Sequence, residues 1–239
     1  MKRIRLTKVD LYSIGICLLS VVPGFMVYSR LPEEIPVHFG LDGNPNGYAS
    51  RLFAILGIPL IVTLIQVIYC ITSNLLRRDR EMNRAERVIR FLPPVVLYVS
   101  QIFILMYSMG KVTNVITVLG AVETAVFLIL GNYLPKVRRT MFYGIRTPHT
   151  LASEELWDKT HRFAGLIYVI AGVVCMIITV VGLHPATLLV LLLFTVGIPF
   201  IYSEILYRRM KKNSKVLTPD KEDLDKEDLD KEDMKNVGY

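Results

Sequence analysis

The chain has 239 residues, of which 52% are hydrophobic, and its formal net charge is +7. Ordinary soluble domains hold about 45–50% apolar residues, and here the excess is gathered in long stretches that almost lack charge. The Lys and Arg residues flank these stretches, so the basic balance does not indicate a nucleic-acid-binding protein. Composition therefore predicts an integral membrane protein.

Six stretches are long enough to cross the hydrocarbon layer as helices, which takes about 20 apolar residues. Lipid cannot satisfy exposed backbone groups, and the stretches lack the alternating pattern of a membrane β-barrel. The sequence therefore predicts an all-α fold, a polytopic membrane bundle of six transmembrane helices. The predicted spans are Leu11–Tyr28, Leu52–Ile71, Phe91–Met109, Val112–Leu134, Ala164–Leu183 and Ala186–Tyr207.

The first span follows a basic segment, as the apolar part of a signal peptide would. Its apolar stretch is longer than that of a signal peptide, and no small-residue cleavage site follows it. We predict a retained helix. Cys17, Cys70 and Cys175 lie within or at the end of spans, so we expect small hydrophobic residues and no disulfide framework.

The segment between the first two spans, Ser29–Arg51, is too rich in Pro and Gly to be a helix. The dipeptides at 42–43 and 46–47, Asp-Gly and Asn-Gly, are strong turn signals. Residues 37–39 are predicted to form a short extended piece that leads into these turns. We expect this segment to be an ordered cap outside the membrane.

His38 and Asp42 form a candidate polar binding pair in this external loop. A metal site would need more ligands, and the only other external histidine, His184, belongs to a distant loop. We therefore predict no metal site. Recognition of an external peptide by this pair is left open against a purely local role in the loop.

The segment Leu75–Arg90 is basic and follows the second span. Met82, Ala85, Val88 and Ile89 recur at three- and four-residue steps, which indicates a helix. We predict that this helix lies at the cytoplasmic headgroup boundary, with its arginines against anionic lipid.

Glu123 lies near the middle of the fourth span, where a charge costs about 2.5–3.5 kcal/mol on insertion scales. Its carboxyl must therefore be protonated, paired, or turned toward a wet cavity. It is a candidate proton or ligand site. The alternative is a structural carboxyl that is hydrogen-bonded to a neighbouring helix, with Gln101 of the third span as the candidate partner.

The longest cytoplasmic loop runs from Gly131 to Gly165. Gly144 and Pro148 are predicted to break any helix in its first half, and Ser153 to cap a new helix that continues into the fifth span. The loop combines basic residues with aromatic ones, which favours a folded cytoplasmic platform with a partner over simple headgroup contact. Its basic residues are Arg138, Arg139, Arg146, Lys159 and Arg162.

The distribution of Lys and Arg predicts that both termini are cytoplasmic. The segment before the first span, the loops at 77–90 and 136–162, and the segment 208–215 are rich in Lys and Arg, whereas the alternate loops hold few. Beyond Asn213 the chain repeats KEDLD, and it lacks the apolar residues needed for a core, so we predict a disordered acidic tail.

The predicted organisation has five parts. They are 1–51, the first span and external loop; 52–134, spans two to four with a basic cytoplasmic loop; 135–163, the platform; 164–212, spans five and six; and 213–239, the acidic repeat tail. The sequence holds no HExxH, GxSxG or glycine-rich phosphate loop, so neither an enzyme nor a cofactor is predicted.

Two loops resemble the Sdp immunity protein family. Its external loop is written P-x-H-[FW] followed by a polar glycine turn, and the corresponding segment here is LPEEIPVHFGLDGNPNGYASR. Its cytoplasmic signature is matched by GNYLPKVRR and by FYGIRTPHTLASEELWDKTHRFAG. The two motifs occur in the same order in that family, and the resemblance covers about residues 8 to 212.

The resemblance implies a membrane protein that protects Gram-positive bacteria against a secreted peptide toxin. Some members of the family also act as receptors that, on sensing toxin, hold an ArsR-type autorepressor at the membrane. Carried over by position, the external recognition residues are Pro36, His38, Asp42, Gly43, Asn44 and Gly47. The cytoplasmic signalling residues, counting the basic side chains nearby, are Asn132, Arg138, Arg139, Gly144, Ile145, Arg146, Thr147, Pro148, Trp157, Thr160, His161 and Arg162.

The chain departs from the family pattern at three places. His149 stands where an aromatic residue is common, Thr140 stands where Asn is expected, and the KEDLD tail is not part of the pattern. These departures leave open the repressor partner and the toxin. The alternatives are a small transporter, which would use Glu123 and Gln101 as a polar site, and a membrane scaffold, which would need only the platform.

Overall fold

The structure is a computed structural model that describes residues 6–76, 81–184 and 186–217. Six helical segments in this part of the chain are long and apolar enough to cross a membrane, which confirms the predicted all-α membrane bundle. They are Lys8–Met26, Phe53–Leu76, Arg84–Ser108, Val115–Lys136, Glu154–Val181 and Ala186–Lys212.

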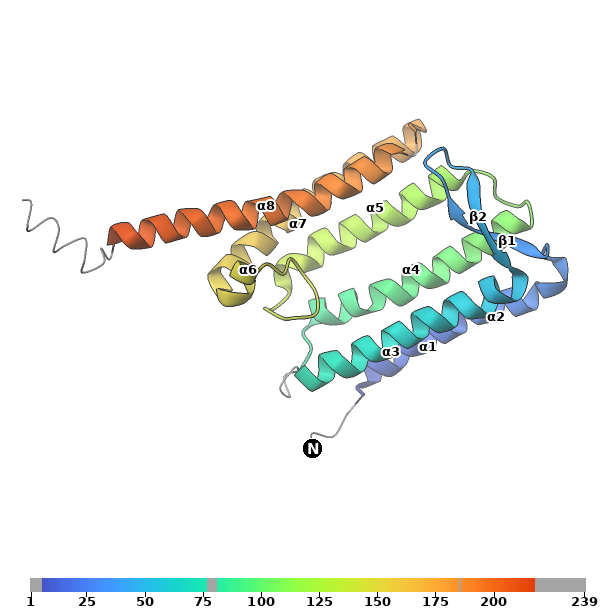
Figure 1. Ribbon diagram of the computed structural model, residues 1–239, viewed down its shortest axis with the longest axis horizontal. Coiled ribbons are helices and arrows are strands. Elements are labelled where there is room, and N and C mark those ends of the chain that lie inside the picture. The colour runs from blue at the N-terminus through green and yellow to red at the C-terminus, as the bar shows by residue number, and fades with distance from the viewer. Residues whose placement is uncertain (1–5, 77–80, 185, 218–239) are drawn as a thin grey trace, which may run out of the picture.

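The helices lie side by side, and the two ends of the bundle differ (Figure 1). At one end, which we call the hairpin end, strands β1 (Glu34–Phe39) and β2 (Pro45–Ser50) lie across the bundle. At the other end, the platform end, lie the start of the first helix and the short helix α6 (Pro148–Ala152).

The first half of the chain forms α1 (Lys8–Leu19), α2 (Val21–Met26), the hairpin, α3 (Ile58–Leu76) and α4 (Arg84–Ser108). A 3-10 turn, Tyr28–Arg30, precedes β1, and a π-helical turn, Phe53–Gly57, precedes α3. Thr7 and Asn83 cap α1 and α4, because each accepts a bond from the third helical residue, whose carboxylate bonds back to the cap. Both helices therefore begin at sharply specified residues.

The helix predicted in Leu75–Arg90 is present over 84–90, but it is not a separate element. The helix α3 extends to Leu76, and α4 begins at Arg84 and continues into the third span. Met82, Ala85 and Arg90 are buried, so the apolar period that predicted a lipid-facing helix marks the packed face of α4. Residues 77–80 lie outside the described residues.

The hairpin is more regular than the sequence predicted. β1 and β2 pair antiparallel, with Glu34 opposite Ser50 and His38 opposite Gly47, so the expected extended piece at 37–39 is part of a full strand. The turn predicted at 42–43 is present, and Gly43 has a φ of 79°, which favours glycine. The turn predicted at 46–47 is wrong, because these residues lie within β2.

The second half of the chain forms α5 (Val115–Tyr133), the 3-10 turn η3 (Leu134–Lys136), α6, α7 (Glu154–Val181) and α8 (Ala186–Leu217). Ser153 caps α7, as predicted, whereas Pro148 begins α6 where the sequence predicted a break. Proline is accepted there because the first helical N–H has no partner inside the helix. The helix α8 extends to Leu217, past the start of the predicted disordered tail, and residues 218–239 lie outside the described residues.

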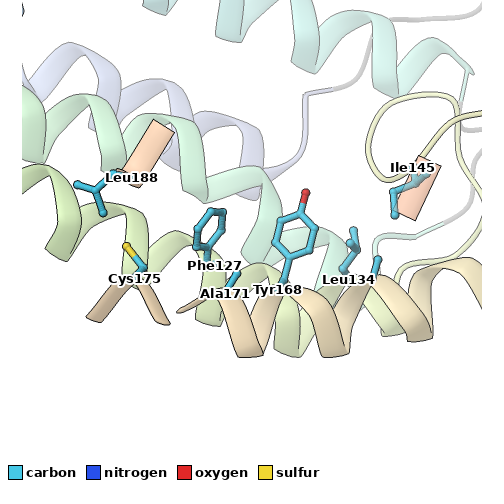
Figure 2. Close-up of a cluster of buried hydrophobic side chains, with 8 residues drawn as sticks. Phe127, Leu134, Ile145, Tyr168, Ala171, Cys175 and Leu188 are labelled. Atoms are coloured by element: carbon cyan, nitrogen blue, oxygen red, sulfur yellow. The ribbon is translucent and has the colours of Figure 1, made fainter. Parts of the chain in front are cut away.

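The largest apolar core lies between α5, α7 and α8 (Figure 2). The ring of Phe127 meets that of Tyr168 edge to face, with 5.7 Å between centroids. Gly131 and Gly165 let α5 and α7 approach closely, because a Cβ at Gly131 would lie 3.0 Å from the carbonyl oxygen of Gly165. This close contact fixes the position of the platform, which follows α5 directly and precedes α7.

Candidate functional site

The hairpin is anchored to the bundle by its apolar face. Ile35 is fully buried and belongs to a core cluster with Leu31, Ala54, Ile55 and Leu105. The ring of Phe39 packs against Phe103 and Tyr107 of α4, with centroid distances of 5.9 Å and 5.1 Å. These contacts make the hairpin a fixed cap on the ends of α4 and the π-helical turn, as the sequence predicted for this loop.

The outer part of the hairpin presents polar side chains, each of which is held by an asparagine. Nδ1 of His38 donates to the amide oxygen of Asn46 across the two strands, at 2.5 Å. The carboxylate of Asp42 accepts the side-chain and backbone N–H groups of Asn44, at 2.9 Å and 3.1 Å. These bonds stabilise the charged form and lower the pKa of Asp42.

The six predicted recognition residues therefore play different structural roles. His38, Asp42 and Asn44 are exposed, whereas Pro36 is buried. The remaining two are glycines that shape the hairpin: Gly43 forms the turn, and a Cβ at Gly47 would lie 2.9 Å from that of His38. Only the first three present polar groups to a ligand.

Two exposed apolar side chains that the prediction did not include lie beside these polar groups. Leu41 is 58% exposed at the turn, and Tyr48 is 56% exposed on β2. For Tyr48, the period of two along β2 is the signal that could have found it, since its neighbours Gly47 and Ala49 point to the other face of the strand. The resulting surface combines apolar and polar groups, which suits an amphipathic peptide.

His184 is closer to this surface than its distant position in the sequence predicted. It lies in the connection between α7 and α8, and its charge makes a small contribution to the lowered pKa of Asp42. Within the described residues, no three His, Cys, Asp or Glu side chains gather in a way that could hold a metal ion. The arrangement favours binding by hydrogen bonds and apolar contact.

Gln101, the candidate partner of Glu123, bonds elsewhere. Gln101 is buried and donates to the carbonyl oxygen of Ala54 at 3.3 Å, so it connects α4 to the π-helical turn. Glu123 is half-buried on α5, and its Oε1 is buried without a hydrogen-bond partner among the described residues. The alternative of a hydrogen bond between the two residues is therefore not supported.

A buried ion pair at the platform end escaped the sequence analysis. Asp10 of α1 and Arg90 of α4 are both fully buried, with 2.8 Å between Oδ1 and Nη1. Asn74 of α3 donates to the second oxygen of Asp10 at 2.7 Å, and Arg90 donates to the hydroxyl of Ser73. The three helices α1, α3 and α4 are thus joined by charged and polar groups.

The sequence signal for this pair is weak but present. Asp10 is a single acid in a basic segment, at the third position of its helix, and Arg90 falls on the buried face of α4 with Ala85. Both residues were left outside the spans because the predicted spans were drawn from apolar runs alone. Each lies one residue before a predicted span, so a small extension of both helices would have brought the two charges into the bundle.

The platform, which we define as residues 134–152, is fastened to α7 by Trp157 and His161. The indole N–H of Trp157 donates to the carbonyl oxygen of Val137 at 2.9 Å. Nε2 of His161 accepts the backbone N–H of Ile145 at 3.0 Å, so the proton of a neutral ring lies on Nδ1, which is 2.8 Å from the carbonyl oxygen of Trp157. Both side chains are fully buried.

Gly144 is required where the platform crosses these two rings. Its φ is 100°, and a Cβ there would collide with Nε2 of His161 and lie 3.1 Å from the ring of Trp157. The next residues are held by Thr147 and Thr150, which form a capping box, and Thr150 also donates to the carbonyl oxygen of Ile145 at 2.8 Å. The platform is therefore a rigid element.

The platform also contacts α8 and the first half of the chain. His149 stacks on Tyr207 of α8, with 3.6 Å between ring centroids and 3.1 Å from its Nε2 to a carboxylate oxygen of Glu204. Phe142 and Tyr143 meet the ring of Tyr69 on α3, which in turn lies 5.0 Å from the guanidinium of Arg90. Aromatic contacts thus connect the platform to the buried ion pair.

The predicted signalling residues differ in burial. Ile145 of the platform is buried, as are Trp157, Thr160 and His161 of α7, whereas Gly144 and Thr147 are half-buried. The exposed ones are Arg138, Arg139, Arg146 and Pro148 on the platform, Asn132 on α5 and Arg162 on α7. Arg139 and Arg146 also fix the loop by donating to the carbonyl oxygens of Leu151 and Met141.

Two family models match separate segments of the chain. Residues 136–203 match the model of the SdpI/YfhL protein family, and residues 15–63 match a domain of unknown function, DUF1648. The first match covers the platform, α7 and most of α8, whereas the second covers the first span, the hairpin and the start of α3.

One relative aligns over most of its own length. The immunity protein SdpI of Bacillus subtilis is 30% identical over 179 residues, which cover 72% of this chain and 82% of the relative. An uncharacterized protein of Archaeoglobus fulgidus is 34% identical over 89 residues, covering 37% of this chain and 46% of the relative. No solved structure matches the chain.

Proposed function

This chain belongs to the SdpI/YfhL protein family, and on that premise we propose that it is a multi-pass membrane immunity protein that protects its cell against a secreted peptide toxin. The observation that carries the proposal is the similarity to the Bacillus subtilis immunity protein SdpI along 82% of that protein. We assign it no catalytic step and no cofactor.

The hairpin end is proposed to face outward. Among the loops that join the spans, those at 77–90 and 136–162 hold far more Lys and Arg residues than the loops at the hairpin end, and basic loops of this kind remain cytoplasmic. This orientation places both termini in the cytoplasm. It also places the exposed side chains of His38, Asp42, Leu41 and Tyr48 outside, where a secreted peptide arrives.

We test the proposal by expressing the chain in toxin-sensitive cells that lack their own immunity protein and following their membrane potential under toxin challenge. The parent chain is expected to hold the potential, and His38→Ala and Asp42→Ala are expected to lose protection at equal expression. Glu34→Ala is the matched control, because it removes an exposed carboxylate from the same hairpin but away from its turn. Absence of protection by the parent against every related toxin would reject the immunity function.

The finer part of the proposal is that the platform also signals. Its exposed arginines stand on a rigid loop, and such a fixed arrangement of cations suits recognition of an acidic protein surface. The partner proposed by family resemblance is an ArsR-type autorepressor, which would be held at the membrane once toxin is bound. Toxin must then bind one arrangement of the bundle better than another.

Two sets of variants separate signalling from protection. Arg138→Gln and Arg146→Gln are expected to lose induction of a reporter controlled by the repressor while protection is retained, because both side chains lie on the outer surface of the platform. Glu123→Gln tests whether the half-buried carboxyl on α5 couples the two ends. Unchanged protection and unchanged induction in that variant would exclude Glu123 from coupling.

A further inference from the structure

A polar pocket of about 410 Å³ opens at the platform end, between the start of α4 and the end of α5. It is lined by Asn83, Arg84 and Ala85 from α4 and its cap, and by Tyr133 and Lys136 from α5 and η3. Ligand pockets in proteins usually measure about 300–1,000 Å³, so this volume is sufficient for a small polar group.

Two cations give the pocket its chemical character. Arg84 and Lys136 are exposed, and within the described residues neither forms an ion pair. Glu86, the nearest acid along the chain, is fully buried, and its carboxylate accepts the backbone N–H of Asn83 at 3.0 Å. Within the part of the chain that the structure describes, the lining therefore offers two positive charges that have no ion-pair partner.

The walls of the pocket are held in place by contacts across it. The side-chain amide of Asn83 donates to the carbonyl oxygen of Lys136 at 2.9 Å, which ties the cap of α4 to η3. The ammonium group of Lys136 lies 5.5 Å from the ring centroid of Tyr133. The capping box already uses the first turn of α4, so side-chain cations, and not the helix end, would hold a ligand.

Both walls are ends of segments that can span the membrane, Arg84–Ser108 and Val115–Lys136. In a bilayer such ends lie at the level of the headgroups, where Tyr and Lys side chains are favoured. We propose that this pocket binds the phosphate group of an anionic phospholipid, with Arg84 and Lys136 as its ligands. The site is independent of toxin recognition.

A phosphate bound in this pocket would hold the start of α4 close to the end of α5, two helices whose covalent connection lies at the hairpin end. Val137, which follows Lys136 directly, accepts the indole N–H of Trp157, so a phosphate bound at Lys136 would also steady the platform. The expected ligand is a headgroup such as phosphatidylglycerol, because a guanidinium and an ammonium recognise a phosphate oxygen without further donors.

Native mass spectrometry of the full chain, released from nanodiscs that hold equal amounts of phosphatidylglycerol and phosphatidylcholine, tests the site. We expect preferential retention of one phosphatidylglycerol. Each cation removed, in Arg84→Gln or Lys136→Gln, is expected to weaken this retention about fivefold. The matched control is Arg30→Gln with Lys111→Gln, which removes two exposed cations at the hairpin end.

The outcomes separate lipid from free anion. Retention that survives millimolar inorganic phosphate but falls in the two variants supports a lipid site. The lipid site is overturned if inorganic phosphate displaces the lipid, or if phosphatidylglycerol and phosphatidylcholine are retained equally. It is also overturned if phosphatidylglycerol retention falls as much in the Arg30→Gln with Lys111→Gln control. Arg84→Lys keeps the charge and should retain the lipid. The thermal unfolding profile of each variant is compared with that of Arg84→Lys, so that loss of lipid through misfolding is recognised.

Discussion

The two halves of the molecule are held together by opposite means. In the first half, α1, α3 and α4 converge on a buried ion pair between Asp10 and Arg90, surrounded by hydroxyl and amide groups. In the second half, α5 and α7 meet through Gly131 and Gly165, with an apolar core around Phe127. One family model matches residues 15–63 in the first half, and the other matches residues 136–203 in the second.

The two halves therefore depend on different interactions for their rigidity. Small residues allow helix backbones to approach closely in lipid, where helix association relies on packing and hydrogen bonds, and the result is a fixed frame for the platform. A buried ion pair depends on both partners, because removing one leaves an uncompensated charge. We therefore expect single substitutions to affect the first half more strongly than the second.

The largest effect is expected from Asp10→Asn. The substitution leaves the buried guanidinium of Arg90 without its counter-charge, and breaking a buried pair costs about 3–5 kcal/mol of the free energy of unfolding. Reversible unfolding in detergent measures the loss. The double variant Asp10→Asn with Arg90→Met should recover part of this loss. If the double variant loses as much stability as Asp10→Asn alone, the unpaired charge of Arg90 is not the cause.

Gly144→Ala should come next and tests the junction of platform and α7. A side chain is strained at a φ of 100° and also meets His161, so we expect a loss of about 2–4 kcal/mol. Gly110→Ala is the matched control, because Gly110 has a φ of 71° but no neighbour within 4 Å. Equal losses in the two variants would mean that only backbone strain matters at Gly144.

A smaller loss, about 1–3 kcal/mol, is expected from Gly165→Ala, because the new Cβ would meet Pro135 and lie 2.8 Å from the carbonyl oxygen of Gly131. Gly197→Ala on α8 is the control, since nothing lies within 4 Å of a Cβ there. Thermal unfolding followed by Trp157 fluorescence reports on both. If Gly165→Ala is as stable as its control, α5 and α7 are not limited by close packing.

The smallest effect concerns the turn of the hairpin. The pKa of Asp42 lies below its ordinary value of 3.8 because Asn44 donates to the carboxylate. A depressed pKa in the folded state means that this contribution to stability is complete above the unfolded pKa and is lost as the pH falls through the folded one. Carbon-13 titration of labelled Asp carboxyls should show that Asn44→Ala raises this pKa; an unchanged value would refute the assignment.

The sequence could predict the membrane class, the six spans and the capped start of α7 because each is a local property of composition and period. Ser153 stands before an acidic helical turn, and the spacing of Trp157, His161 and Ala164 places them on one helical face. The resemblance in the platform identified His161 and Trp157, but not that the two rings would be buried as supports. Their burial depends on how residues 137–145 fold over α7.

What the sequence determined by itself was the number of helices and their order, since long apolar runs leave the backbone no other stable form in lipid. Only the tertiary structure decided that Asp10 and Arg90 meet, that Glu123 and Gln101 do not, and that the external loop is a two-stranded hairpin. These outcomes depend on contacts between helices far apart in the chain. No local period determines which faces of different helices pack together.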